Sequence, residues 1–256
     1  MNRAQFPKLF DLTGRVAVVT GGTRGIGRSI AEGFVFAGAK VVAASRKADA
    51  CAETEAHLRS LGGDALGVAT HMGDLDALAA LVDTTVDQFG RLDIVVNNAA
   101  TSLSLPLGGF TVDAWNKAYD VNLRGPVFLL QYALPHLTAS PCAAVINVVS
   151  AGAFVASPSV AMYSGAKAAL MSFTRAQASE WAPLGIRVNA LAPGTVDTYM
   201  VRNNPPEVQA AMAAASPMAR AAHPDEMIGP ALLLASDAGS FVTGHVVFAD
   251  GGLVSH

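Results

Sequence analysis

The sequence predicts an α/β protein built on one doubly wound sheet of seven mainly parallel strands, with helices on both faces. Short runs of β-branched and other apolar residues alternate along the chain with longer stretches whose apolar residues recur at helical spacing. The expected strands are continuous apolar runs, as in a parallel sheet that is covered on both faces. No linker or change in composition divides the chain, so we expect a single domain over residues 1–256.

The expected strands and helices alternate from residue 15 onward. Strands are expected at 15–20, 41–44, 65–70, 94–96, 144–149, 186–191 and 245–248, and helices at 25–38, 50–61, 75–89, 111–137, 161–182 and 225–235. Asp74 and Thr111 are expected N-caps, and Gly38 closes the first helix. Gly125-Pro126 should kink the helix at 111–137, because proline cannot donate a helical hydrogen bond. Residues 1–13 resemble an N-terminal arm, and residues 195–223 are expected to be irregular.

The composition argues against several classes of function. The chain is 52% hydrophobic and 14% charged with a net charge of −3, and no Lys/Arg cluster indicates binding to nucleic acid or to a membrane surface. Its apolar runs are shorter than the roughly 20 residues that span a bilayer. The two cysteines and the histidines show no disulfide framework or metal-ligand spacing, and residues 1–8 lack an apolar signal core. We therefore expect a cytoplasmic protein with no metal site.

A glycine-rich turn, Thr20-Gly-Gly-Thr-Arg-Gly-Ile-Gly27, follows the first expected strand. Gly21 can take dihedral angles that a Cβ would forbid. Gly25 and Gly27 allow backbone to approach a ligand and the helix to pack close to the strand. The N–H groups at the start of the helix suit a pyrophosphate. Taken alone, the turn is also compatible with an ordinary connection between a strand and a helix.

A tyrosine and a lysine lie one helical turn apart, at Tyr163 and Lys167, and therefore share a helix face. An ammonium group beside a phenol favours phenolate and lowers the tyrosine pKa, so that the phenol can transfer a proton near neutral pH. Ser150 ends the preceding strand, and the intervening loop could bring its hydroxyl beside the phenol. By itself, the Tyr-Lys spacing is more typical of a packed tyrosine and a solvated lysine.

The motifs occur together and in a characteristic order. They are Thr20-Gly-Gly-Thr-Arg-Gly-Ile-Gly27, Asn97-Asn-Ala-Ala100, Asn122, Ser150, Tyr163-x-x-x-Lys167 and Pro193-Gly194. In this order and at these spacings, the chain closely resembles the short-chain dehydrogenase/reductase family over about residues 10–252. The resemblance implies a Rossmann-type fold and an oxidoreductase that uses a nicotinamide cofactor.

The resemblance implies catalytic roles for four residues. Tyr163 would be the general acid in carbonyl reduction and the general base in alcohol oxidation, while Ser150 would hydrogen-bond the substrate oxygen. Lys167 would hold the nicotinamide ribose and lower the tyrosine pKa. Asn122 would anchor a water that connects Lys167 to solvent, although it could also be a polar residue on the solvated side of a helix.

The resemblance also implies a set of cofactor-binding residues. These are Gly21, Thr23, Arg24, Gly25, Ile26, Gly27, Ser45, Arg46, His71, Met72, Asn98, Ala99, Tyr163, Lys167, Pro193, Gly194 and Val196. The family often has Asp at the position of His71, which here either contacts adenine or only ends a strand. Ala100 replaces the glycine of the common Asn-Asn-Ala-Gly. Asn97 would brace the central strands and line the cofactor cleft, whereas Asn189 could be structural or contact the cofactor.

The residues after the second strand favour NADP(H) over NAD(H). An acidic residue at this place grips the ribose diol in folds that prefer NAD. Here the strand is followed by Ser45-Arg46-Lys47, and the first acid, Asp49, is expected in the next helix. Arg46, Ser45 and Arg24 of the glycine turn can hydrogen-bond a 2′-phosphate. In the alternative, Arg46 and Lys47 are a solvated helix start and both cofactors bind alike.

The sequence thus predicts reversible hydride transfer to a small, largely apolar carbonyl, most simply by a carbonyl reductase. The segment 195–223 is the expected substrate loop. Its apolar residues Tyr199, Met200 and Met212, together with Phe154 near Ser150, predict a pocket with apolar walls. Alternatives are a 3-oxoacyl-carrier-protein reductase and a non-catalytic protein that senses the cofactor. The first is disfavoured because Ser179-Glu180 stands where that subclass often has Arg-Glu. The second is disfavoured because the catalytic residues are present.

The chain is expected to assemble as a homotetramer, with a dimer as the alternative. The expected helices 111–137 and 161–182 carry apolar residues on more than one face, including Phe128, Met171 and Phe173. One side of such a helix can pack on the sheet and the other on a partner subunit. The family is commonly tetrameric through two such helices and the last strand.

Overall fold

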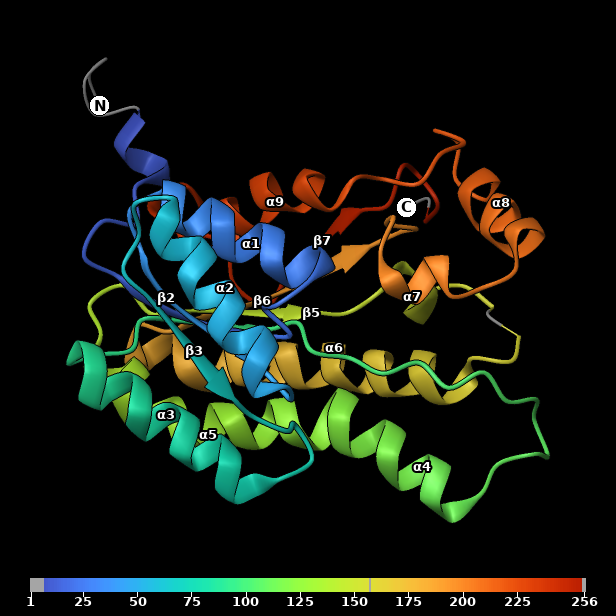
Figure 1. Cartoon of the computed structure of the whole chain (residues 1–256), viewed down its shortest axis with the longest axis horizontal. Coiled ribbons are helices and arrows are strands. Elements are labelled where there is room, and N and C mark those ends of the chain that lie inside the picture. Colours follow the sequence, from blue (N-terminus) through green and yellow to red (C-terminus); the bar gives the residue numbers. More distant parts are fainter. Residues whose placement is uncertain (1–6, 157, 255–256) are drawn as a thin grey trace.

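The sheet at the centre of the protein has seven parallel strands in the order β3-β2-β1-β4-β5-β6-β7 (Figure 1). This computed structural model describes residues 7–156 and 158–254. The strands are β1 (Val16–Thr20), β2 (Lys40–Ser45), β3 (Ala65–Ala69), β4 (Ile94–Asn97), β5 (Ala144–Val148), β6 (Arg187–Pro193) and β7 (Val246–Ala249). The predicted fold class is confirmed, and within the described residues every pairing between these strands is parallel.

Helices cover both faces of the sheet because successive strand side chains point to opposite faces. Ala17 and Val19 of β1 pack toward α1 (Gly25–Phe36), α2 (Ala48–Ser60) and α9 (Ile228–Ala235). Val18, between them, packs toward α3 (Leu75–Phe89), α5 (Gly125–Ala139) and α6 (Ala161–Trp181). Figure 1 shows these two layers above and below the strands. None of the helices in the described part of the chain has the length and apolar character needed to cross a bilayer.

The predicted caps are present at two helix starts. The Asp74 carboxylate accepts hydrogen bonds from the N–H groups of Asp76 and Ala77, each at 3.1 Å. The Thr111 hydroxyl accepts one from the Ala114 N–H at 3.1 Å, at the start of α4 (Val112–Tyr119). These side chains satisfy backbone donors that the first helical turn leaves without partners.

The expected long helix at 111–137 is divided into three parts. A π-helical turn over Asp120–Arg124 separates α4 from α5. The break agrees with the predicted kink, since Pro126 has no N–H to donate to the carbonyl of Asn122 four residues earlier. The irregularity therefore falls at a candidate catalytic residue, where π-turns are often found.

Three segments differ from the sequence prediction. Residues 195–223 are not wholly irregular, because α7 (Tyr199–Arg202) and α8 (Pro206–Ala214) lie within them. The helix expected at 225–235 begins as a 3-10 turn over Pro224–Met227 before α9. The expected N-terminal arm is ordered against the domain from residue 7 onward. Pro7–Phe10 forms a 3-10 turn, and Leu12 is fully buried with its N–H 2.8 Å from the Ala37 carbonyl. Residues 1–6 of that arm lie outside the described residues.

The candidate site lies where the strand order changes direction, between β1 and β4. From β1 the chain moves outward to β2 and β3, then returns to pair β4 on the other side of β1. The connections after β1 and β4 therefore leave the same edge of the sheet and diverge. In open α/β sheets the crevice at such a switch point is where ligands bind.

Candidate active site

The glycine turn after β1 holds a backbone shape that side chains would block. Gly21 and Gly25 have positive φ angles of 65° and 53°. A Cβ on Gly27 would lie 2.3 Å from both the Asn98 amide nitrogen and the Gly21 carbonyl oxygen. The turn is therefore open to close backbone approach at the start of α1, which fits the pyrophosphate of a dinucleotide.

Asn98, predicted to bind cofactor, supports this turn from β4. Its side-chain amide donates to the Thr20 carbonyl at 2.8 Å and to the Gly21 carbonyl at 3.2 Å. In return, the Thr20 hydroxyl accepts from the backbone N–H groups of Asn98 at 3.0 Å and of Ala99 at 3.1 Å. The loops after β1 and β4 are thus tied together, and Thr20 is a structural contributor that the sequence analysis did not name as a site residue.

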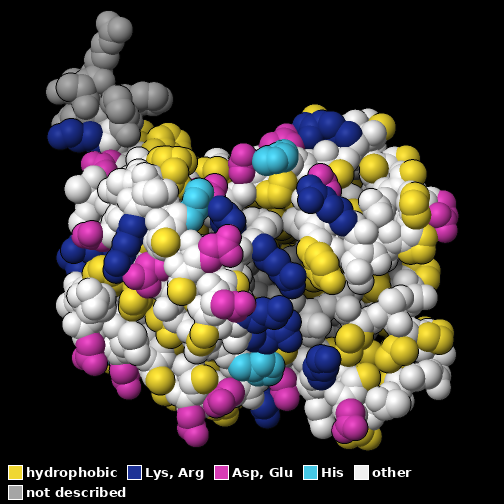
Figure 2. All heavy atoms as spheres, viewed as in Figure 1, with side chains coloured by type: hydrophobic (Ala, Val, Ile, Leu, Met, Phe, Trp, Pro, Cys, Tyr) yellow, Lys and Arg dark blue, Asp and Glu magenta, His cyan; other side chains and the backbone are white. Residues whose placement is uncertain are grey.

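The end of β2 presents a positive charge without a competing carboxylate at the strand end. Ser45 ends the strand half-buried, and Arg46 and Lys47 are exposed. Asp49 lies in the first turn of α2, as predicted, and its carboxylate accepts from the Ala50 N–H at 2.9 Å. Figure 2 shows Lys and Arg side chains gathered near the middle of the face that contains α2 and α7. This arrangement fits an additional phosphate.

Two residues after β3, His71 and Met72, belong to the predicted cofactor-binding set. His71 is exposed, and its Nδ1 accepts a hydrogen bond from the Gly73 N–H at 3.1 Å. Met72 is buried, and its carbonyl oxygen would be 2.2 Å from a Cβ placed on Gly125. His71 thus stabilises its own turn through one ring nitrogen, while Met72 packs against the start of α5.

Ser150, Tyr163 and Lys167 come together at the end of β5 and the start of α6. The Lys167 side chain is 1% exposed, its Nζ donates to the Val148 carbonyl at 2.7 Å, and it lies 5.9 Å from the centre of the Tyr163 ring. A hydrogen bond joins the hydroxyls of Ser150 and Tyr163. The Ser150 Oγ also accepts from the Gly152 N–H at 3.1 Å, which fixes its orientation.

The pKa of Tyr163 differs in direction from the sequence expectation. Burial raises the pKa of Tyr163, and the hydrogen bond with Ser150 acts in the opposite direction with a smaller effect. Burial also lowers the pKa of Lys167 to about 8. The expected lowering of the tyrosine pKa by Lys167 is absent, because the ammonium is directed to the Val148 carbonyl and desolvation dominates. Tyr163 is therefore a neutral phenol near pH 7.

Asn122 is fully buried, so the interpretation of a polar residue on a solvated helix face is wrong. Its side-chain amide donates to the carbonyls of Thr101 and Ala118, each at 2.8 Å. Its Oδ1 accepts from the Thr101 N–H at 3.1 Å. The side chain therefore fixes the loop after β4 to the π-helical turn, and both of its amide N–H groups are used in doing so.

Asn97 begins a buried polar chain across the sheet. Its amide donates to the Asn147 Oδ1 at 2.9 Å and to the Pro126 carbonyl at 3.3 Å, and the Asn147 amide donates to the Thr174 hydroxyl at 2.9 Å. These contacts brace β4 and β5 against α6, as expected for Asn97. Sequence reasoning missed Asn147 and Thr174, although an asparagine inside an otherwise apolar strand was a visible signal.

The segment after β6 completes the edge of the site. Pro193 ends β6, and a Cβ on Gly194 would lie 2.7 Å from the Asp250 Cα, which explains the need for glycine there. Val196 forms an isolated parallel bridge with Ala222. The bridge uses the Thr195 carbonyl and the Asp197 N–H, so the backbone polar groups of Val196 face away from it.

Asn189 has a structural role, one of the two roles that the sequence left open. Its amide donates to the Val242 carbonyl at 2.8 Å, and its Oδ1 accepts from the His245 N–H at 3.1 Å. These two bonds fix the turn that leads into β7.

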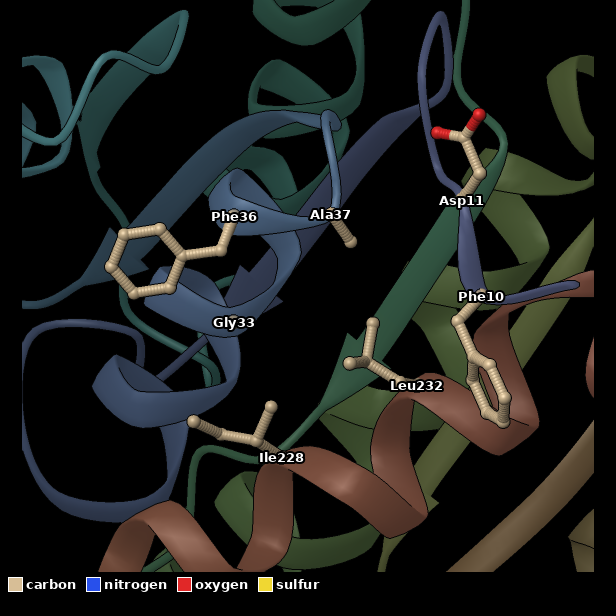
Figure 3. Close-up of a pocket in the computed structure, with 7 residues that line it drawn as sticks. All are labelled: Phe10, Asp11, Gly33, Phe36, Ala37, Ile228 and Leu232. Atoms are coloured by element: carbon tan, nitrogen blue, oxygen red, sulfur yellow. The ribbon is translucent and has the colours of Figure 1, made fainter. Parts of the chain in front are cut away.

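A second groove in the described part of the chain has few groups that could take part in a reaction. This groove, of about 390 Å³, lies between the 3-10 turn at Pro7–Phe10, α1 and α9, where Phe10, Phe36, Ile228 and Leu232 give it mainly apolar walls (Figure 3). Among the described residues that line the groove, Asp11 is the titratable one. Residues 7–156 and 158–254 contain no group of three or more His, Cys, Asp or Glu side chains that could hold a metal ion.

Known proteins share this sequence and this geometry. A protein family described as enoyl-(acyl carrier protein) reductase matches residues 21–254. The cis-4-hydroxycyclohexanecarboxylate dehydrogenase of Sinomonas cyclohexanicum is 40% identical over 239 residues, which are 93% of this chain and 96% of that protein. The chain belongs to the short-chain dehydrogenase/reductase family. As a member of this family, it is an oxidoreductase that interconverts CH–OH and C=O groups with a nicotinamide cofactor.

Two further members of the short-chain dehydrogenase/reductase family are similar over nearly the whole chain. A 3-oxoacyl-[acyl-carrier-protein] reductase of rhamnolipid biosynthesis in Pseudomonas aeruginosa is 38% identical over 250 residues, 95% of this chain and 97% of that protein. A solved 3-oxoacyl (acyl-carrier-protein) reductase of Agrobacterium tumefaciens C58, with NADP bound, is 35% identical with a TM-score of 0.89, covering 95% of this chain and 96% of its own. The relatives thus share the fold but are described with different substrates.

Proposed function

We propose that this protein is an NADPH-dependent reductase of a small, largely apolar carbonyl compound. The observation that carries the proposal is the grouping of Ser150, Tyr163 and Lys167 at the end of β5 and the start of α6, where a hydrogen bond joins the Ser150 and Tyr163 hydroxyls and the phenol is neutral near pH 7. A neutral phenol is the form that donates a proton to a developing alkoxide, so the site suits reduction. The nicotinamide, when bound, supplies the hydride, and the protein supplies the proton and the orientation.

Each catalytic side chain has a separate role in this proposal. Tyr163 donates the proton, and the Ser150 hydroxyl, held by Gly152 and hydrogen-bonded to the phenol, binds the substrate oxygen. Lys167, desolvated and anchored on Val148, holds the nicotinamide ribose and returns a proton to the phenol from solvent. Asn122 anchors a water on that route through its backbone, since its side chain is engaged with Thr101.

The cofactor-binding surface supports a preference for NADP(H). The glycine turn with Thr23 and Ile26 receives the pyrophosphate, and Asn98 and Ala99 line the cleft from β4. Ser45, Arg46 and Arg24 hydrogen-bond the 2′-phosphate; Asp49 is held in the first turn of α2. Met72 and His71 border the adenine, and Pro193, Gly194 and Val196 border the nicotinamide. NADP in the Agrobacterium tumefaciens relative is consistent with this assignment.

The substrate binds, in this proposal, between the catalytic residues and the loop 195–223. Exposed Tyr199 and Met200 of α7 and half-buried Met212 of α8 are apolar residues of that loop. Phe154, just after Ser150, packs edge-on against Phe248 with ring centres 4.7 Å apart. Walls of this kind favour a small apolar carbonyl over a highly charged one.

A 3-oxoacyl-carrier-protein reductase is the second candidate, because several relatives are described in that way. Ser179-Glu180 at the end of α6 argues against it, since a basic residue there would help to hold an acidic carrier. A cofactor sensor without turnover is disfavoured by the intact catalytic group.

We also propose a cytoplasmic homotetramer assembled through the outer faces of α4, α5 and α6 and the last strand. Phe173 on α6 and Trp115 on α4 are exposed apolar side chains in the single chain. Light scattering at micromolar concentration should give the mass of four chains, with two as the alternative. A monomer would refute the proposal.

The deciding experiment measures kcat/KM for NADPH and NADH over a panel of small ketones and aldehydes, with a 3-oxoacyl carrier-protein substrate as a separate arm. We expect at least a tenfold preference for NADPH, which is about 1.4 kcal/mol of transition-state binding. The double variant Arg24→Ala/Arg46→Ala should lose most of this preference. A wild-type enzyme that prefers NADH would refute the cofactor assignment, and activity confined to the carrier-bound substrate would refute the substrate class.

A further inference from the structure

An aromatic residue of the loop 195–223 stacks on an arginine of the glycine turn. The Arg24 guanidinium carbon lies 4.7 Å from the centre of the Tyr199 ring. The two residues are 175 positions apart in the sequence, and Tyr199 is the first residue of α7. The neighbouring residues also meet, because a Cβ on Gly25 would lie 3.1 Å from the Thr198 methyl group. The start of α7 therefore rests on the turn that receives the cofactor.

This stacking leaves the hydrogen-bonding groups of Arg24 available. A guanidinium is planar, so an aromatic ring on its face does not obstruct the N–H groups that point outward in its plane. Neither a carboxylate nor another side-chain acceptor engages Arg24 in the part of the chain that the structure describes. By contrast, the neighbouring Arg28 is paired with Glu32 at 2.9 Å. Arg24 thus combines a fixed orientation with free donors.

We propose that Tyr199 is a positioning residue that holds Arg24 for the cofactor 2′-phosphate and so links cofactor identity to the placement of α7. This inference rests on the proposed preference for NADP(H). An arginine side chain that is already oriented loses less conformational freedom when it binds a phosphate. Because the effect is mutual, a 2′-phosphate that fixes Arg24 also strengthens its contact with Tyr199. NADPH would then order the substrate loop more than NADH does.

The size of the effect follows from the exposure of the pair. Tyr199 is 61% exposed, and a cation–π contact at an exposed site changes an equilibrium by about two- to fivefold. The Tyr199→Ala variant should therefore bind NADPH about two- to fivefold more weakly. Its affinity for NADH should not change, because NADH has no 2′-phosphate for Arg24.

The test is a fluorescence titration of the dissociation constants of NADPH and NADH, without carbonyl substrate. Tyr199→Phe keeps the ring and should bind both cofactors as wild type does. Asn203→Ala, at the exposed residue directly after α7, is the control for damage to the helix and should also leave both constants unchanged. Equal weakening of NADPH and NADH by Tyr199→Ala, or no weakening, would overturn the inference.

The Arg24→Ala variant separates this inference from the proposed function. If Arg24→Ala weakens NADPH selectively and Tyr199→Ala does not, the positioning role fails and the cofactor assignment stands. If Arg24→Ala/Arg46→Ala leaves NADPH binding unchanged, the cofactor assignment itself fails.

Trypsin cleavage after Arg202, at the end of α7, gives a second readout of the inference. In wild type, NADP⁺ should slow this cleavage more than NAD⁺ does, whereas in Tyr199→Ala the two cofactors should slow it equally. Equal slowing in wild type would refute the link to α7.

Discussion

Replacement of Lys167 by methionine should make the protein more resistant to unfolding as it removes activity. Lys167 is buried without a carboxylate partner in the described residues, and its Nζ contacts the Val148 carbonyl. Burial lowers its pKa from 10.5 to about 8. Below about pH 8 the folded protein therefore holds a charged ammonium in a site that disfavours the charge. Methionine has similar length and removes that cost.

The size and sign of the effect follow from proton linkage. Between about pH 8 and pH 10.5 the unfolded chain binds more protons at this lysine than the folded chain does, so this group makes stability rise with pH. The desolvation cost is about 3 kcal/mol at pH 7 and falls to about 1 kcal/mol at pH 9.5 for this pKa pair. The stability advantage of Lys167→Met should therefore shrink by about 2 kcal/mol between these two pH values.

Urea unfolding of wild type and Lys167→Met, at equal protein concentration and at about pH 7 and pH 9.5, measures this difference directly. The lost hydrogen bond to Val148 costs the variant about 1–3 kcal/mol. The part of that bond that depends on charge is already contained in the pKa shift, and the part made by the neutral amine is the same at both pH values and drops out of the comparison. Lys117→Met, which replaces an exposed lysine of α4, is the control and should show no such pH dependence. A stability difference that is constant within about 0.5 kcal/mol would show that Lys167 is not desolvated in this way.

Three more substitutions test the catalytic group, the cofactor turn and the buried polar chain. Tyr163→Phe should lower kcat by about 10²–10⁴-fold with cofactor affinity retained, and residual activity above about a tenth would refute its role as acid. Gly27→Ala places a Cβ against Asn98 and should weaken NADPH binding at least tenfold by titration, whereas Gly229→Ala, in open space, should not. Asn147→Ala should lower the free energy of unfolding by about 2–4 kcal/mol in urea. A loss below about 1 kcal/mol would show that the polar chain contributes little.

The location of the site follows from local chemistry combined with one topological event. Side chains at the carboxyl ends of parallel strands lie at the same edge of the sheet. The residues that follow β1, β4, β5 and β6 are therefore brought to one site by the pairing of the strands. The π-helical turn at Asp120–Arg124 is a second feature with a local cause. Pro126 interrupts the helix beside Asn122, whose side chain binds the backbone of Thr101. The family's function is thus built on features that short segments encode.

The sequence by itself determined the fold class, the alternation of strands and helices, and the caps at Asp74 and Thr111. These features depend on side-chain periodicity and turn chemistry within about ten residues, which a single chain displays directly. It also identified the glycine turn and the Tyr163–Lys167 pair by spacing. The helices inside 195–223 were not predicted from the sequence, because the prolines of this segment are turn signals and indicate irregular backbone.

Only the tertiary structure decided how these residues behave. The raised pKa of Tyr163 depends on desolvation by neighbouring elements, and the direction of the Lys167 ammonium depends on a carbonyl of β5. The chain from Asn97 to Asn147 forms because β4 and β5 are adjacent, and Arg24 meets Tyr199 because the chain returns to the first turn. Burial and contacts between distant segments cannot be recognised in a short stretch of sequence. The helices and strands could therefore be predicted from the sequence, but the pKa values and hydrogen-bond partners of the site residues could not.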